Sequence, residues 1–85
     1  MELVFTKTGK KDYEKILEDK HLSKVAYKLL ELLERNPFEY PPSFKKLSGG
    51  LSNFYSRRIN KQHRLVYEID GNQVVVISMW SHYEF

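Results

Sequence analysis

Apolar and polar residues follow patterns along the chain that change from strand-like to helical and back. Residues 2–6 read Glu-Leu-Val-Phe-Thr, a short run rich in strand-forming side chains. Further on, apolar residues recur every three or four positions and form one helical stripe: Leu22, Val25, Ala26, Leu29, Leu30 and Leu33. This spacing predicts a helix that ends at Asn36-Pro37, because proline cannot continue the helical hydrogen-bond ladder.

A shorter helix is predicted between the first strand and this stripe. Thr6 or Thr8 can cap its start by accepting backbone N–H groups. Its apolar face consists of Tyr13, Ile16 and Leu17. Residues 19–23 interrupt the pattern, and Ser23 is the expected cap of the second helix. Two short helices joined by about four residues favour an antiparallel helical hairpin.

The second half of the chain predicts strands. Residues 37–50 hold three prolines and two glycines, which predicts an irregular connection. Three strands are then predicted at 51–60, 62–69 and 74–80, with a hairpin turn at Asp70-Gly71-Asn72 between the last two. Helices grouped beside an antiparallel meander imply an α+β fold with two layers in the order β-α-α-β-β-β. We expect the 85 residues to form a single domain, 1–85.

Alternation along the strands divides their side chains between two faces of the sheet. The face toward the helices should carry Tyr55, Ile59, Leu65, Tyr67 and Ile69. The open face, away from the helices, should carry Phe54, Ser56, Arg58, Arg64, Val66 and Glu68. Arg57 falls on the helix side, and we expect it to reach an edge of the sheet or to pair with a helix carboxylate.

The charge distribution supports a basic open face. Residues 1–39 carry eight bases and eight acids, whereas residues 40–67 carry six bases and no acid. A stretch of 28 residues without a carboxylate is typical of an anion-binding surface, although a solvated basic face would look the same.

Composition argues against several classes of protein. The chain has no cysteine, which excludes disulfides and thiolate metal sites. Its stability must therefore come from packing, from a partner chain, or from both. A second copy of the chain, in a homodimer, is one such partner. The three histidines are too scattered to suggest a zinc site, and no motif calls for a cofactor. No apolar run is long enough for a membrane span or a secretory signal, so we expect a cytoplasmic protein.

The remaining candidates suit phosphate chemistry. They are Lys45, Lys46, Arg58, Arg64, His82 and Tyr83. RNA carries its own nucleophile, the 2′-hydroxyl, so a protein that cleaves it need only orient that group, neutralise the phosphate and move protons. Histidine is suited to proton transfer because its ordinary pKa is about 6.5, but His82-Tyr83 could equally be a frayed tail.

The other histidines and the tryptophan favour structural roles. His63 precedes Arg64 and therefore points toward the helices, which predicts a packed or capping side chain. His21 lies in the break between the helices and should be exposed. Trp80 could stack on a base, yet a place in the core or at a partner contact is at least as consistent with the pattern.

Two sequence blocks resemble a known family. Leu51-Ser52-Asn53-Phe54-Tyr55-Ser56-Arg57-Arg58-Ile59-Asn60, with the following Gln62-His63-Arg64-Leu65-Val66-Tyr67 and the terminal His82-Tyr83, is similar to the YoeB/Txe toxins of the RelE-like superfamily. The resemblance implies a RelE-like fold and an mRNA endoribonuclease that works in the ribosomal A site. It also implies a YefM-like antitoxin, and ribosome and mRNA as partners, with rRNA as a further candidate.

The resemblance also implies roles for particular residues. The phosphate-binding arginine of the family falls on Arg64, an auxiliary arginine on Arg58, and the acid and positioning pair on His82 and Tyr83. The family's general-base glutamate falls on Lys45, which is a departure. Three explanations remain open: a lysine-based mechanism, a carboxylate such as Glu39 that swings in, or a weakened chain.

Two other functions compete with the endoribonuclease. A non-catalytic inhibitor could occupy the ribosome through the same basic face, and the missing glutamate favours it slightly. A gyrase poison on the related ParE-like fold is a third hypothesis, against which the His-Tyr ending argues.

Overall fold

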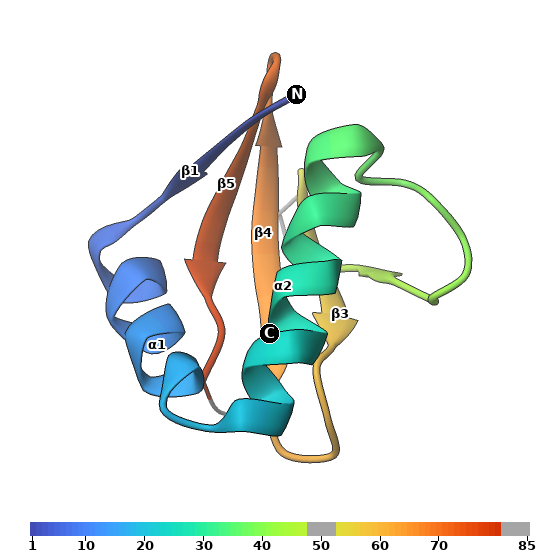
Figure 1. The fold of residues 1–85 in the computed structure, drawn as a ribbon. Helices are drawn as coiled ribbons and strands as arrows, with labels where there is room; N and C mark the ends of the chain where they lie inside the picture. Colours follow the sequence, from blue (N-terminus) through green and yellow to red (C-terminus); the bar gives the residue numbers. More distant parts are fainter. Residues whose placement is uncertain (48–52, 81–85) are drawn as a thin grey trace.

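Two helices cover one face of a five-stranded sheet in the computed structural model, which describes residues 1–47 and 53–80 (Figure 1). The elements are β1 (Glu2–Phe5), α1 (Lys7–Leu17), α2 (Lys20–Arg35), β2 (Lys45–Lys46), β3 (Phe54–Arg58), β4 (Arg64–Asp70) and β5 (Gln73–Ser78). The strand order is β1-β5-β4-β3-β2, with β1 parallel to β5 and the other neighbours antiparallel. The predicted two-layer α+β fold is therefore confirmed, and β2 is a strand that the predicted order lacked.

Side-chain caps set where each helix begins. The Thr6 hydroxyl accepts a hydrogen bond from the Gly9 N–H at 3.0 Å, as predicted for the first helix. For α2 the predicted cap, Ser23, is wrong. The carboxylate of Asp19 accepts the N–H groups of His21 and Leu22, both at 2.9 Å, so α2 begins at Lys20 and includes Ser23. Asp binds two free backbone donors at once, which fixes the boundary more tightly than a single hydroxyl would.

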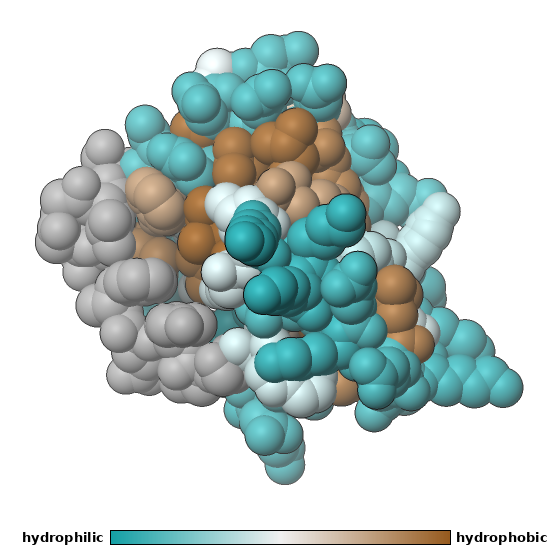
Figure 2. Space-filling view, turned by 90° about the vertical axis from the view of Figure 1, so that its left-hand side faces the viewer, coloured by the Kyte–Doolittle hydropathy of each residue, from teal (hydrophilic) through white to brown (hydrophobic). Residues whose placement is uncertain are grey.

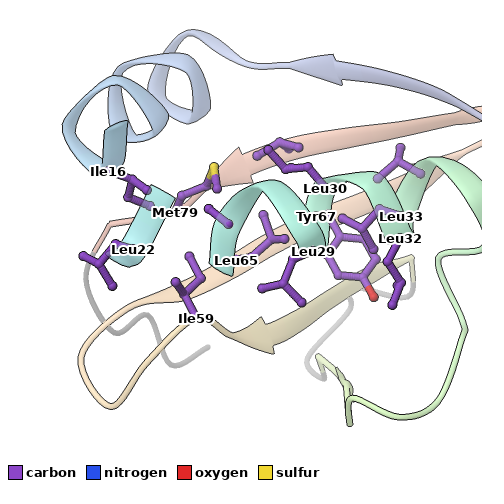
Figure 3. Close-up of a cluster of buried hydrophobic side chains, with 13 residues drawn as sticks. Ile16, Leu22, Leu29, Leu30, Leu32, Leu33, Ile59, Leu65, Tyr67 and Met79 are labelled. Atoms are coloured by element: carbon purple, nitrogen blue, oxygen red, sulfur yellow. The ribbon is translucent and has the colours of Figure 1, made fainter. Parts of the chain in front are cut away.

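The hydrophobic core lies between α2 and the central strands (Figure 3). The leucine stripe of α2 packs against Leu65 and Tyr67 of β4 and against Val74 and Val76 of β5, all four of them fully buried. The helix-side alternation predicted for β4 is thus confirmed. Burial of this stripe is the main source of stability for a helix that contributes little by itself. Val66 lies on the open face and yet is also fully buried.

Strand β1 forms one edge of the sheet. Figure 2 views the molecule from the side of α1 and β1 and shows hydrophobic surface bordered by hydrophilic surface. Leu3, Val4 and Phe5 of β1 are only partly buried, and Phe5 stacks on Tyr13 of α1 at 5.6 Å between ring centroids. Within residues 1–47 and 53–80, neither helix has the length and apolar character needed to cross a membrane.

A buried carboxylate ties α1 to the end of β5. Asp12 is 8% exposed, and its Oδ2 accepts the backbone N–H groups of Met79 at 3.0 Å and Trp80 at 3.3 Å. These two donors follow the last residue of the strand, where the ladder no longer provides acceptors. Asp12 therefore fixes the direction in which the chain leaves the sheet.

Replacing this carboxylate should destabilise the fold. We expect Asp12→Ala to lower the free energy of unfolding by about 1–3 kcal/mol, because it leaves buried N–H groups without an acceptor. Urea denaturation of the purified protein measures the change. Glu14→Ala, which removes an exposed carboxylate from the same helix, is the matched control. Equal effects of the two substitutions would show that the Asp12 hydrogen bonds contribute nothing.

Candidate active site

A hollow of about 300 Å³ lies on the open face of the sheet, at its β2–β3–β4 side. We call it the anion hollow, and it is lined by Ser43, Phe44, Lys45, Ser56, Arg58 and Arg64. Three of the six lining residues are cationic, and none is acidic. Three cations around one small concave surface create a local positive potential that attracts a phosphate or another anion.

Strand register brings the three cations together. Arg58 of β3 lies directly opposite Arg64 of β4, and Lys45 of β2 lies opposite Ser56 of β3. Three adjacent strands therefore each contribute one cation to the hollow. Like charges placed directly across a strand pair are unfavourable unless something compensates them, so this arrangement is typical of a site that binds an anion.

The structure separates two residues that the sequence grouped. Lys45 lines the anion hollow, whereas Lys46 pairs with Tyr55, whose side chain packs against the core on the helix side. Successive residues of a strand point to opposite faces, so Lys46 lies on the face away from the hollow. His82 and Tyr83 fall outside the described residues. Ser56 faces the hollow, as its predicted place on the open face implied, although sequence reasoning gave it no role in the site.

Glu39, the carboxylate suggested as a replacement base, is held elsewhere. Its side chain forms an ion pair with Arg35 at 3.2 Å, and its backbone carbonyl accepts a hydrogen bond from Arg57. Neither contact lies in the anion hollow, whose described lining contains no carboxylate. In this structure Lys45 alone occupies the position at which the general base was expected.

Arg57 corrects a second expectation. It neither reaches an edge nor pairs with a helix carboxylate: it is 1% exposed and donates to backbone carbonyls of the segment 37–42. Its Nε also donates to the Tyr67 hydroxyl at 3.2 Å. Burial raises the pKa of Tyr67, and the neighbouring Arg57 partly opposes that rise. Tyr67 therefore remains a neutral hydroxyl that donates in turn to the Pro37 carbonyl.

His63 is packed, as predicted. It is 3% exposed, and its ring stacks on Trp80 with 4.1 Å between centroids. The Lys15 ammonium lies 5.7 Å from the centroid of the Trp80 ring, which adds a cation–π contact. This stack holds the end of the described chain beside the residue that precedes Arg64. His21 is exposed, as predicted.

A larger hollow lies between the helices, but its charges do not suit a phosphate. It measures about 560 Å³ and is lined by Tyr13, Leu17, Ser23, Lys24, Tyr27, Lys28 and Glu31. Its charges are of both signs and its other lining residues are mainly apolar or aromatic. The anion hollow is smaller and is the better candidate for phosphate chemistry.

Comparison with known proteins assigns the family. Residues 5–83 match the model of the YoeB-like toxin of bacterial type II toxin–antitoxin systems. The chain belongs to this family. It is 36% identical over 85 residues to the toxin YoeB of Synechocystis sp., with 99% of each chain covered. As a YoeB-like protein, it is the toxin component of a type II toxin–antitoxin system, as the sequence blocks around Arg58 and Arg64 predicted.

Solved structures of YoeB proteins share the fold. The heterotetrameric YoeB–YefM complex from Staphylococcus aureus matches with a TM-score of 0.82 and 35% identity, over 98% of each chain. The YoeB dimer from the same species matches with a TM-score of 0.84, the same identity and the same coverage. The RelE-like architecture implied by the sequence is thereby confirmed.

Proposed function

We propose that this YoeB-like toxin is a ribosome-dependent mRNA endoribonuclease. The observation that carries the proposal is the convergence of Lys45, Arg58 and Arg64 in one hollow. The 2′-hydroxyl of the RNA attacks the adjacent phosphorus as it loses its proton. The bond from phosphorus to the 5′-oxygen breaks, and that oxygen gains a proton. The products are a 2′,3′-cyclic phosphate and a free 5′-hydroxyl, and the reaction requires no metal because the nucleophile belongs to the substrate.

The two arginines stabilise the phosphate as negative charge increases in the transition state. Arg64 is half-buried in the hollow, and Arg58 is exposed directly opposite it. A guanidinium offers several N–H donors in a fixed plane, which suits two phosphate oxygens better than a lysine ammonium does. Arg64 should attract the phosphate more strongly than Arg58 does, because it is less exposed and water therefore screens its charge less.

We assign His82 as the acid that protonates the leaving 5′-oxygen and Tyr83 as a positioning group. Trp80 is anchored on His63, the residue immediately before Arg64. Two further residues span at most about 7 Å between Cα atoms, so the chain length allows His82 to act near this anchor. The hydrogen bonds that the Met79 and Trp80 N–H groups donate to the Asp12 carboxylate hold the same anchor. The position of Trp80 beside His63 supports the assignment of His82 to the site that contains Arg64.

The proton acceptor that the family resemblance implies is a glutamate, and Lys45 stands at its position in this chain. We expect Lys45→Glu to increase the rate of mRNA cleavage about 10-fold or more, since it supplies a general base beside the phosphate. Single-turnover cleavage on programmed ribosomes measures the rate. Lys46→Glu makes the same change of charge on the other face and should have the smaller effect.

A decrease for Lys45→Glu would instead indicate that the chain already uses its lysine in catalysis. Identical rates for the wild type, Lys45→Glu and Lys46→Glu would remove position 45 from the reaction altogether.

A non-catalytic inhibitor of the ribosome is the second candidate function. The specific observation that favours it is a hollow that has three cations but no described carboxylate. Such a surface binds RNA phosphates without requiring a base. In that case the toxin would stall translation without cutting mRNA.

We also propose that a YefM-like antitoxin neutralises the toxin in the cytoplasm. The relative from S. aureus forms a heterotetramer with YefM, and another structure shows it as a dimer. The anion hollow of this chain calls for an acidic segment from such an antitoxin, because opposite charge speeds association. The antitoxin and the RNA would then compete for the same three cations.

A further inference from the structure

Arg57 is a buried cation without a role in the chemistry proposed so far. Its side chain is 1% exposed and lies on the helix side of β3, between Ser56 and Arg58, which both face the anion hollow. A buried guanidinium is costly unless its N–H groups have acceptors. Its partners therefore indicate what it does in the fold.

Those partners belong to one loop, residues 37–44, which connects α2 to β2. Nη2 donates to the carbonyls of Pro37 and Glu39, both at 2.9 Å, and Nη1 donates to the carbonyl of Pro42 at 2.6 Å. The guanidinium carbon also lies 4.8 Å from the centroid of the Phe44 ring. A single side chain therefore contacts the loop at four positions along its length.

Three of the eight loop residues are prolines, which have no N–H group, and the N–H groups of Phe38 and Glu39 donate to Asn36 rather than to carbonyls of the loop. Ring contacts of Phe38 and Phe44 with Tyr55 also hold the loop against β3. Buried carbonyls nevertheless need donors, and Arg57 supplies several within a fixed plane. Lysine could not reproduce this geometry, because all its N–H groups are on one nitrogen, whereas those of a guanidinium are spread over three.

The same loop forms one wall of the anion hollow. Ser43 and Phe44 line the hollow, and the loop leads directly into Lys45 of β2. We infer that Arg57 is a positioning residue, which holds the 37–44 loop so that Lys45 faces the phosphate beside Arg58 and Arg64. This inference rests on the proposed function in so far as it takes the anion hollow to be the RNA phosphate site.

A double-mutant cycle between Arg57 and Lys45 tests the inference. The four proteins are the wild type, Arg57→Lys, Lys45→Ala and the double variant. The probe is a 2′-deoxy dinucleotide, which has one phosphodiester and cannot be cleaved, and NMR titration gives its dissociation constant. If Arg57 acts through Lys45, Arg57→Lys should weaken binding about 3-fold or more in the wild type and leave it unchanged when Lys45 is already alanine.

Two control variants separate positioning from stability. Arg35→Lys alters an exposed arginine whose described side-chain contact is with the Glu39 carboxylate rather than with a backbone carbonyl of the loop, and it should leave binding unchanged. Ile16→Val loosens the core at the end remote from the loop (Figure 3), and it should lower the melting temperature without weakening binding. If Arg57→Lys does not fold, Tyr67→Phe replaces it, because the Tyr67 hydroxyl joins Arg57 to the Pro37 carbonyl.

The outcomes distinguish this inference from the proposed function. Equal losses of binding in both backgrounds, or no loss for Arg57→Lys, would overturn the positioning role even if the wild type cuts mRNA. Loss of binding only when Lys45 is present supports that role even if the wild type cuts nothing. If the wild type cuts mRNA on ribosomes, the positioning role predicts that Arg57→Lys lowers kcat with little change in KM.

Discussion

Arg64→Ala should reduce ribosome-dependent cleavage of mRNA by about 10²–10³-fold, the usual cost of removing one preorganised charge-stabilising donor. Arg64 is the half-buried cation of the anion hollow and begins β4, where its backbone pairs with Arg58 of β3. Its contribution is made in the transition state, where the phosphate carries more charge than in the bound substrate. Single-turnover cleavage on ribosomes programmed with a defined mRNA measures the loss.

The control for this prediction is Arg35→Ala, which removes an exposed arginine at the end of α2. Arg35→Ala changes the net charge by the same amount as Arg64→Ala, but Arg35 lies outside the hollow. The rate of mRNA cleavage by this variant should therefore stay near that of the wild type. Thermal unfolding should show that Arg64→Ala remains folded. Cleavage by Arg64→Ala at a rate close to that of the wild type would remove Arg64 from the reaction.

His82→Gln should abolish detectable cleavage and leave ribosome binding largely intact. Protonation of a leaving oxygen by a positioned side chain contributes about 10²–10⁴-fold, and glutamine cannot donate a proton in this way. Glutamine keeps much of the size and hydrogen-bonding capacity of histidine, so docking contacts should survive. Cosedimentation with ribosomes measures binding, and primer extension measures cleavage.

His21→Gln is the matched control, because His21 is an exposed histidine on α2 and has no place in the proposed site. It should behave as the wild type in both assays. If His82→Gln loses binding and cleavage together, His82 is a docking residue and the proton must come from another group.

Hydrophobic periodicity was sufficient to predict most of the fold. The apolar residues of the α2 stripe and of alternate β4 positions are the ones that the structure buries. Leu65 and Tyr67 accordingly lie in the core, as the pattern predicted. The same alternation put Arg58 and Arg64 on one face, and the strand register confirms that they are opposite each other. In a regular helix or strand, side chains on the same face recur at a fixed spacing. The spacing of hydrophobic residues therefore indicates which face is buried.

Features that depend on contacts between distant segments were missed. Strand β2 has only two residues in a proline-rich connection, too few to show any period. The partners of Arg57 are backbone carbonyls. Every residue has one, so the sequence does not indicate which of them Arg57 contacts. Nothing in the sequence distinguishes Asp12 from the other polar residues of α1, because its partners lie 67 and 68 positions later. Ser23 was the predicted cap of α2, and the cap that the structure shows, Asp19, was missed because the exact start of a helix depends on local geometry.

The most direct test of the central claim is to map mRNA ends while the purified toxin acts in a reconstituted translation reaction. We predict sharp cuts at fixed positions within codons, only on ribosome-bound mRNA, that leave a 2′,3′-cyclic phosphate and a 5′-hydroxyl. Stalled ribosomes on uncut mRNA would contradict the claim and identify a non-catalytic inhibitor, and DNA breaks with intact translation would contradict it in favour of a gyrase poison.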